Sequence, residues 1–289
     1  YKDMVILIDI GGGCMKRIVT IQDISCLGKC SLTVALPIIS AMGIETSIIP
    51  TAVLSTHTLW NNYMCDDLTD KIPLVAKHWK SEGFTFDAIY TGYLGSIEQI
   101  DIMCNFFDEF KTDDNFVFVD PAMADNGELY KNFDEEFANK MRVLCGKADI
   151  IVPNLTEACM LTDTEYKKEY DNEYITEVLK KLTELGSSKA IITGAHYNGK
   201  YGIMSYDSTS SEYSFYAHKK IDRIFYGTGD VFSSACVGAL TKGYPLAKSV
   251  EIAGEFVYES IKFTMNDNDA RFYGVNFEQA LPMLAKYNK

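Results

Sequence analysis

The sequence predicts an α/β fold of three layers, in which a mainly parallel sheet lies between two layers of helices. Short runs of β-forming residues alternate with longer amphipathic runs over about 200 residues, a pattern typical of strand–helix units joined in a parallel sheet. The dipeptide Asn198-Gly199 then follows a strand-like run, and Asn-Gly suits a type I′ turn. We therefore expect an antiparallel hairpin at one edge of the sheet.

The expected strands are short runs rich in β-branched and aromatic residues. They cover residues 17–22, 45–50, 87–91, 116–120, 149–152, 189–193, 201–206 and 212–218. The expected helices have apolar residues at helical spacing. They cover residues 31–42, 66–80, 96–111, 133–145, 156–161, 171–185, 246–264 and 277–287, and a further helix starts directly after Gly227.

Composition narrows the classes of partner. The chain has 289 residues, of which 47% are hydrophobic, and its net charge is −13. So acidic a protein is a poor partner for nucleic acid or an anionic membrane. No apolar run approaches the roughly 20 residues of a membrane span, and the first residues lack the features of a signal peptide. We expect a cytoplasmic protein whose eight cysteines are reduced and mostly buried thiols, and the absence of Cys-x-x-Cys argues against a cysteine metal site.

Residues 15–289 are expected to form a single domain, because no Pro-, Gly- or Ser-rich linker divides them. Met15 could be the natural start, so we interpret residues 1–14 as an N-terminal extension, either native or added by cloning. The triplet at 11–13 is Gly-Gly-Gly. It lacks the G-x-G-x-x-G spacing of a dinucleotide loop and is interpreted as a flexible joint.

The clearest chemical signal is Gly227-Thr228-Gly229-Asp230. A glycine turn that leads into a helix presents unpaired N–H groups and favours an anion. A carboxylate at that place repels a phosphate, but it could accept the proton of an attacking hydroxyl group. The pattern therefore indicates phosphoryl transfer to an alcohol, with a capped helix start as the alternative interpretation.

Polar residues follow each of the expected parallel strands. They are Asp23, the stretch 51–58, Thr91-Gly92-Tyr93, Asp120-Pro121, Pro153-Asn154 and Thr193-Gly194. Each could be ordinary turn chemistry. Because ligands of open α/β sheets bind beyond the carboxyl ends of the strands, the set together predicts a long cleft along one edge.

These blocks also carry a resemblance. The chain resembles the pyridoxal kinase family of the ribokinase-like superfamily in YTGYLGS (90–96), DPAMADNGELY (120–130), VPNLTEA (152–158) and GTGD (227–230). Its stretch 21–58, IQDISCLGKCSLTVALPIISAMGIETSIIPTAVLSTHT, is similar to the bacterial pyridoxine/pyridoxamine kinase subgroup. The resemblance extends from about Met15 to the C-terminus.

The resemblance implies a ribokinase-like fold and a defined reaction. The γ-phosphoryl group of ATP, bound with Mg²⁺, would pass to the 5′-hydroxymethyl group of pyridoxal, pyridoxamine or pyridoxine, in salvage of pyridoxal 5′-phosphate. A homodimer is implied as well. Val152 stands where some members have a threonine beside a monovalent cation, so dependence on K⁺ is left open.

The resemblance also implies roles for individual residues, by position. Asp230 corresponds to the catalytic base, and Gly227, Thr228 and Gly229 to the anion hole. The nucleotide and Mg²⁺ would be held by Asp120, Asp125, Asn154, Glu157 and Thr193, with Asp120 and Glu157 acting on the metal partly through water. The pyridine ring would be held by Asp23, His57, Thr58 and Tyr93.

Alternatives remain at several of these positions. Glu157 also opens a helix, and Asp125-Asn126-Gly127 is a natural turn in a loop that could close over the phosphates. His57 and Tyr93 could be packing residues, whereas His78, His196 and His218 are interpreted as structural or exposed.

Asp23 stands where many pyridoxal kinases have a serine, which favours an amino-bearing ring. A hydroxymethylpyrimidine kinase of thiamine synthesis, and a non-catalytic vitamer-binding protein of the same fold, are therefore the rival functions. A sugar kinase fits less well, because no inserted lid domain follows the first strand.

Overall fold

The computed structural model describes residues 15–221 and 223–288, so the interpretation of residues 1–14 lies outside the described residues. The described chain forms a nine-stranded sheet in the order β11-β10-β9-β8-β5-β4-β1-β2-β3, and a separate two-stranded sheet of β6 and β7. The strands are β1 (Arg17–Ser25), β2 (Glu45–Leu54), β3 (Cys65–Asp67), β4 (Ala88–Thr91), β5 (Phe116–Val119), β6 (Ala124–Asp125), β7 (Glu128–Leu129), β8 (Ile150–Ile151), β9 (Lys189–Tyr197), β10 (Lys200–Asp207) and β11 (Glu212–Ala217).

The middle of the large sheet is parallel. Strand β1 pairs with β2 and β4, and the parallel pairing continues through β5 and β8 to β9. Strands β10 and β11 add an antiparallel hairpin. At its turn, Asn198 and Gly199 have φ of 50° and 70°, as a type I′ turn requires. The expected fold class and edge hairpin are confirmed.

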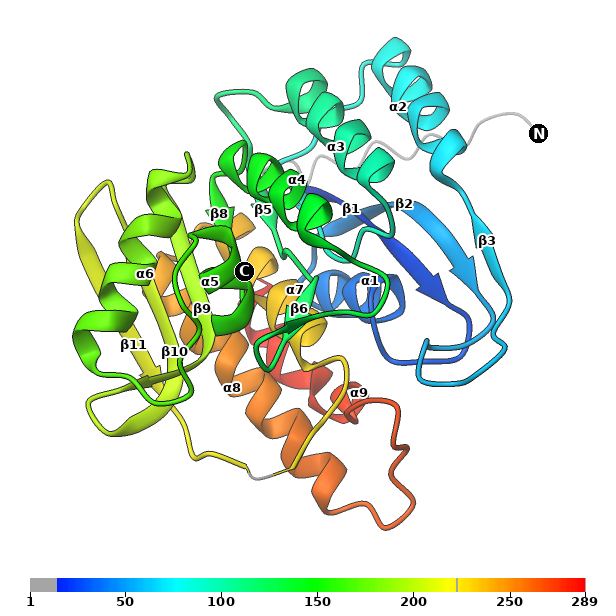
Figure 1. Cartoon of the computed structure of the whole chain (residues 1–289). Coiled ribbons are helices and arrows are strands. Elements are labelled where there is room, and N and C mark those ends of the chain that lie inside the picture. The colour runs from blue at the N-terminus through cyan, green and yellow to red at the C-terminus, as the bar shows by residue number, and fades with distance from the viewer. Residues whose placement is uncertain (1–14, 222, 289) are drawn as a thin grey trace.

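Helices cover both faces of the sheet (Figure 1). They are α1 (Leu32–Ala41), α2 (Ile72–Ser81), α3 (Ile97–Phe110), α4 (Glu135–Gly146), α5 (Leu155–Leu161), α6 (Asn172–Glu184), α7 (Thr228–Thr241), α8 (Leu246–Met265) and α9 (Phe277–Ala280), with 3₁₀ turns η1 (Thr69–Lys71) and η2 (Leu281–Tyr287). Helices α2 to α6 pack on one face, whereas α1, α7, α8 and α9 pack on the other.

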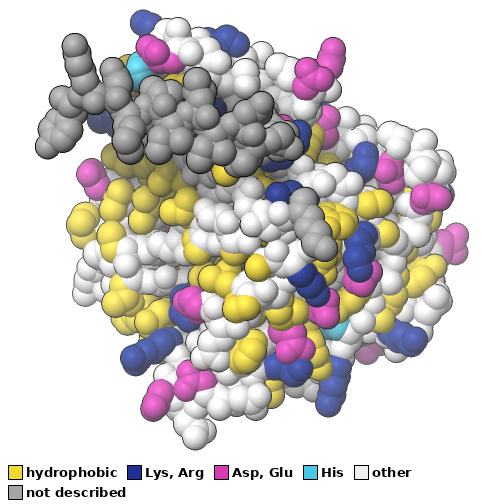
Figure 2. Space-filling model, turned by 180° about the vertical axis from the view of Figure 1, so that it is seen from behind, with side chains coloured by type: hydrophobic (Ala, Val, Ile, Leu, Met, Phe, Trp, Pro, Cys, Tyr) yellow, Lys and Arg dark blue, Asp and Glu magenta, His cyan; other side chains and the backbone are white. Residues whose placement is uncertain are grey.

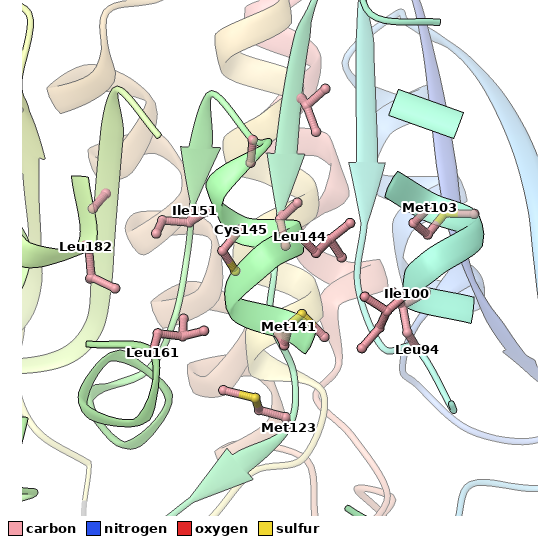
Figure 3. Close-up of a cluster of buried hydrophobic side chains, with 14 of the residues drawn as sticks. Leu94, Ile100, Met103, Met123, Met141, Leu144, Cys145, Ile151, Leu161 and Leu182 are labelled. Carbon is pink, nitrogen blue, oxygen red and sulfur yellow. The ribbon is translucent and has the colours of Figure 1, made fainter. Parts of the chain in front are cut away.

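Alternation along the strands divides the core in two. Ile18, Tyr90 and Phe118 face the layer of α1, α7 and α8. Their sequence neighbours Val19 and Ile89 face the layer of α2 to α6. Figure 3 shows this second core, in which side chains of α3 and α4 meet those of the strands. Both faces of the sheet are therefore buried, which explains why its central strands are continuously apolar.

Several expected boundaries are corrected. The helix expected over 66–80 begins at Ile72, because residues 65–67 form β3, an antiparallel edge strand. All three residues of β3 are exposed, so no apolar alternation marked it. Strand β2 continues to Leu54, and the stretch expected as a loop from Thr51 begins as strand. The small β6–β7 hairpin, which turns at 126–127, was also not expected.

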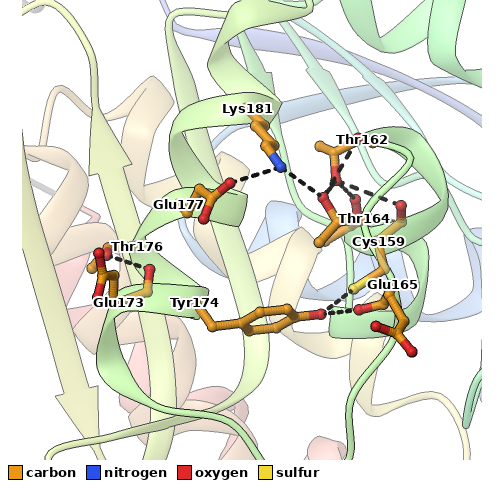
Figure 4. A network of polar contacts seen from close by, with 10 residues as sticks. Cys159, Thr162, Thr164, Glu165, Glu173, Tyr174, Thr176, Glu177 and Lys181 are labelled. Atoms are coloured by element: carbon orange, nitrogen blue, oxygen red, sulfur yellow. Dashed lines mark hydrogen bonds and ion pairs between the residues drawn. The ribbon is translucent and has the colours of Figure 1, made fainter.

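A polar network ties α6 to the chain that follows α5 (Figure 4). The hydroxyl group of Tyr174 donates to the carbonyl oxygen of Glu165 at 2.6 Å and lies 3.1 Å from the thiol of Cys159. Lys181 forms an ion pair with Glu177 and reaches Thr164 at 3.4 Å. These contacts fix the segment around residue 166, which borders the cavity described below.

Charges of both signs are interspersed on the face seen in Figure 2, so the acidic excess is not gathered there. Within the described part of the chain, no helix is both long enough and apolar enough to cross a membrane.

Candidate active site

Gly227 begins the site. It is the N-cap of α7 and has φ of 72°, in the left-handed region. A Cβ atom at this position would lie 2.0 Å from the carbonyl oxygen of Lys29. Both the backbone conformation and this close approach require glycine. The predicted glycine turn and helix are confirmed, and Thr228, Gly229 and Asp230 form the first turn of α7.

No side chain caps α7. The first N–H groups of a helix have no partner within the helix, so the start of α7 can bind an anion, as expected for residues 227–229. Thr228 and Gly229 line the cavity described below, whereas Gly227 packs against the backbone of Lys29 and Cys30.

Asp230 titrates near neutrality. Burial raises the pKa of its carboxyl group to about 7, and repulsion by Asp120 and Asp23 acts in the same direction. A hydrogen bond from the backbone N–H of Ser31 partly offsets these effects. A carboxylate with such a pKa is a better proton acceptor than an ordinary aspartate.

Asp120 and Glu157 lie in one buried carboxyl cluster. Asp120 directly follows β5, its Oδ2 accepts from the hydroxyl group of Ser233 at 2.7 Å, and burial raises its pKa to about 6. Burial and repulsion by Asp120 raise the pKa of Glu157 well above its usual range. A cation at this place would relieve both effects.

Hydrogen bonds occupy both carboxylate oxygens of Glu157, whereas the hydrogen bond from Ser233 occupies Oδ2 of Asp120. Glu157 accepts N–H groups from Met123 at 3.0 Å, Ala124 at 3.4 Å and Asn154 at 2.8 Å, and it forms a capping box with Asn154. The helix-opening interpretation of Glu157 is therefore correct as a structural role.

Among the described residues no three His, Cys, Asp or Glu side chains gather into a metal cluster. Two carboxylates nevertheless suit Mg²⁺, which commonly takes one or two together with phosphate oxygens and water.

A cavity of about 650 Å³ lies beside the start of α7. Five residues predicted from sequence line it: Asp125, Asn154, Thr193, Thr228 and Gly229. Basic side chains also border it, from Lys168, Lys219, Lys220 and Arg223. They supply positive charge that the chain as a whole lacks. The cavity is large enough to hold a nucleotide.

His196 and His218 also line this cavity; His196 is exposed, as expected, and His218 is partly buried. Burial lowers the pKa of His218. Both lie at the antiparallel edge, His196 in β9 and His218 directly after β11. Reasoning from the ends of parallel strands therefore could not find them.

The residues predicted to hold the pyridine ring lie outside the lining of this cavity. Asp23 is buried, and its Oδ1 accepts from the hydroxyl group of Ser31 at 2.5 Å. Burial raises the pKa of Tyr93 to about 12, and repulsion by Asp23, Tyr63 and Cys65 contributes. These electrostatic neighbours place Asp23 and Tyr93 in one region, in which Tyr63 and Cys65 were not expected.

His57 and Thr58 lie in the chain that follows β2. The ring of His57 is 6.0 Å from that of Tyr226, and its Nδ1 accepts from the N–H of Leu59 at 3.1 Å. Burial lowers its pKa, so the ring is neutral near pH 7. Thr58 is exposed. Asp230 directly follows Gly229, which lines the cavity, and the charges of Asp120 and Asp23 both raise its pKa.

The family model described as phosphomethylpyrimidine kinase matches residues 36–273 of the chain. A hydroxymethylpyrimidine/phosphomethylpyrimidine kinase of Bacillus subtilis is 26% identical over 256 residues, which are 88% of this chain and 86% of that protein. A pyridoxine kinase of the same organism is 27% identical over 255 residues, which are 87% of this chain and 86% of that protein.

Solved structures agree. A candidate phosphomethylpyrimidine kinase of Bacteroides thetaiotaomicron, crystallised with pyridoxal, superimposes with a TM-score of 0.89 at 37% identity, over 94% of this chain and 96% of that one. Pyridoxal kinase of Lactobacillus plantarum has a TM-score of 0.86 at 29% identity, over 95% and 98% of the two chains. The chain therefore belongs to the phosphomethylpyrimidine kinase family, has the ribokinase-like fold of the pyridoxal kinases, and is a kinase.

Proposed function

We propose that the chain transfers the γ-phosphoryl group of ATP to the 5′-hydroxymethyl group of a B6 vitamer. The position of Asp230 carries the proposal. It lies in the first turn of α7, directly after Gly229 of the cavity lining, and burial together with the charges of Asp120 and Asp23 raises its pKa to about 7. A base at this point can take the proton of a hydroxyl group while the helix N-terminus stabilises the transferred phosphate.

The nucleotide is assigned to the 650 Å³ cavity, with Asn154 and Thr193 at the strand ends and Thr228 and Gly229 at the phosphates. Asp120 and Glu157 would hold Mg²⁺, with Asp120 the more direct ligand because Glu157 already accepts three N–H groups. The metal would neutralise charge on the phosphates. Asp125 would act from the rim, since it is exposed.

The vitamer is assigned to Asp23, Tyr93 and His57. Support comes from the pyridoxal in the B. thetaiotaomicron structure. The carboxylate of Asp23, held by Ser31, can accept hydrogen bonds from ring substituents, and neutral His57 can accept one and donate one. Thr58 would reach the ring from the exposed side.

We further propose that the protein is a homodimer, which analytical ultracentrifugation would check. Activity assays with and without K⁺ would show whether the enzyme uses a monovalent cation.

The second candidate is phosphorylation of hydroxymethylpyrimidine. It is favoured by the family model and by relatives of that activity. Both substrates are aromatic hydroxymethyl compounds, so the same base and anion hole serve both. A vitamer-binding protein without activity would have no use for a base beside an anion site.

Parallel turnover assays distinguish these functions. ADP production is measured with pyridoxal, pyridoxamine, pyridoxine and hydroxymethylpyrimidine, each at saturating ATP and Mg²⁺. We expect the highest kcat/KM with a B6 vitamer. A preference for the pyrimidine would establish the second candidate, and no turnover with any of the four would leave a binding protein.

A further inference from the structure

The loop 27–31 packs directly on the Gly227 turn. The carbonyl oxygen of Lys29 fills the space that a side chain at 227 would need, and the N–H of Ser31 donates to Asp230. Ser31 has φ of 50°, a conformation that costs energy in a residue other than glycine. Such a loop keeps its shape only if the surrounding structure holds it.

The side chain of Lys29 supplies that hold. Its ammonium group donates to the carbonyl oxygen of Val275 at 3.1 Å, to Oδ1 of Asn276 at 3.2 Å and to Oε2 of Glu278 at 2.8 Å. A lysine has three N–H donors, and all three are used. Its side chain is only 16% exposed, whereas that of Glu278 is 50% exposed, so solvent screens the bond to Glu278 more than those to Val275 and Asn276.

The partners of Lys29 are fixed in turn by α8. The N–H of Asn276 donates to Oγ1 of Thr264 at 2.7 Å, and its side-chain amide donates to Asp267 at 2.8 Å. Thr264 is buried. In Figure 1 the blue helix α1, which follows the loop, lies beside the red C-terminal helices, and α1 packs against η2. A continuous set of contacts thus runs from α8 through residues 275–278 to Lys29.

We propose that Lys29 is a positioning residue for Asp230, and that residues 275–278 hold the loop 27–31 in place through it. In this position the loop directs the N–H of Ser31 toward the carboxylate of Asp230, and the carbonyl oxygen of Lys29 packs against the Gly227 turn. This inference rests on the proposed role of Asp230 as base. Lys29 does not line the nucleotide-sized cavity, so its effect should fall on turnover and spare nucleotide binding.

Steady-state kinetics of Lys29→Met tests the proposal with the vitamer that wild type turns over fastest. Misplacement of a catalytic group by about 1 Å can lower turnover roughly 10²-fold, so we expect kcat to fall between about tenfold and a hundredfold. KM for ATP should stay within about twofold, the signature of a lost transition-state interaction. Glu278→Ala should have the same effect in weaker form, and Glu278→Gln, which keeps an acceptor, should recover most of the loss.

Lys140→Met is the matched control. Lys140 also bridges distant segments, with Asp101 at 2.9 Å, but on the opposite face of the sheet. We expect its kcat to equal that of wild type. Equal kcat in Lys29→Met and Lys140→Met would overturn the proposal, as would a KM for ATP that rises in parallel with the loss of kcat.

Hydrogen exchange on the unliganded protein separates this proposal from the proposed function. If the proposal holds, peptides that cover residues 26–32 and 227–231 exchange faster in Lys29→Met than in wild type, even if no substrate is turned over. Unchanged exchange in both peptides would count against it. Absence of turnover in wild type would instead remove the proposed function, and the exchange result would still decide whether Lys29 holds the loop.

Discussion

Two opposing effects set the pKa of Asp230. Burial and the nearby Asp120 and Asp23 make its carboxylate more basic, whereas the N–H of Ser31 stabilises the charged form. The balance leaves a pKa of about 7. A base with a much lower pKa would accept a proton poorly, and one with a much higher pKa would be protonated in the cell.

Asp230→Asn should abolish most turnover and spare nucleotide binding. General-base assistance is worth roughly 10²–10⁴-fold, so kcat should fall within that range, while the Kd for ATP, measured by calorimetry, changes little. Asp113→Asn, at an exposed position outside the site, is the control. A kcat within a few-fold of wild type in Asp230→Asn would exclude Asp230 as the base.

The rate should depend on pH through the same group. Because a base acts in its deprotonated form, kcat/KM should fall as pH drops through about 7. At pH 6, one unit below this pKa, only about one-tenth of the Asp230 carboxyl groups are deprotonated, so kcat/KM should be about tenfold below its plateau. The residual activity of Asp230→Asn should lack this dependence. If the variant keeps the same acid limb, the limb belongs to another group or to the substrate.

Some of these residues could be found from sequence and others could not. Asp230 and Asp120 stand in local patterns, a glycine turn before a helix and a strand end, and the structure confirms both of these local placements. Ser31 and Lys29 act through partners far along the chain: Lys29 and Glu278 are 249 positions apart. No local pattern records such a contact.

At the scale of elements, the start of α7 depends on its two glycines in different ways. A side chain at Gly227 would meet the carbonyl oxygen of Lys29, whereas one at Gly229 would meet nothing within 4 Å. Gly229 is also helical, where alanine is preferred to glycine by up to about 1 kcal/mol.

Thermal unfolding of three alanine variants separates these effects. Gly227→Ala should lower Tm by several degrees, since overpacking costs about 1–3 kcal/mol. Gly243→Ala has the strained φ of 83° without a clash and should lower Tm less. Gly229→Ala should leave Tm unchanged or higher, although its new methyl group points to the cavity and can raise KM for ATP. A drop in Tm for Gly229→Ala as large as that for Gly227→Ala would contradict this account.

The capping box of α5 also holds the chain that leads into the β6–β7 hairpin. Glu157 accepts N–H groups from Met123 and Ala124 as well as from Asn154. Its removal in Glu157→Ala leaves three donors without an acceptor, and each costs about 1–3 kcal/mol if it stays buried.

Urea unfolding should rank the Glu157 variants accordingly. We expect Glu157→Ala to lose more stability than the ordinary cap variant Ser96→Ala, which costs about 1 kcal/mol. Glu157→Gln keeps one of the two acceptor oxygens and removes repulsion with Asp120, so its stability should lie between those of wild type and Glu157→Ala. Equal losses in all three variants would mean that the bonds to Met123 and Ala124 contribute nothing.

Element boundaries show where sequence reasoning failed. The strand–helix alternation was predicted because both faces of the sheet are buried, which makes its strands apolar. Strand β3 escaped notice because Cys65, Asp66 and Asp67 are all exposed, and its strand form depends only on pairing with β2. The extension of β9 to Tyr197 likewise depends on its pairing with β10.

At the scale of the whole molecule, most of the described thiols are shielded from solvent, and those of Cys145 and Cys236 lie in the two cores. Cys30, Cys145, Cys159 and Cys236 are buried, Cys104 is partly buried, and Cys26 and Cys65 are exposed. Burial raises the pKa of the thiols of Cys145 and Cys236, which further lowers their reactivity.

Titration with a thiol reagent measures this division. In the variant Cys14→Ser, we expect Cys26 and Cys65 to react quickly in the native protein and the other thiols only after unfolding in guanidinium. Mass spectrometry identifies the labelled residues. Fast labelling of Cys145 or Cys236 in the native protein would show that the cores open far more readily than their packing indicates.

The contacts of Lys29 also set an order in time. The loop 27–31, the central strands and Asp230 all leave the ribosome before residues 275–278, on which the ammonium group of Lys29 depends. A nascent chain can therefore contain all the residues proposed for catalysis and substrate binding. It still lacks residues 275–278, which hold the loop 27–31 through Lys29. If Lys29 acts as we propose, the kinase would gain its full rate only after residues 275–278 have left the ribosome, later than the residues of its phosphate site.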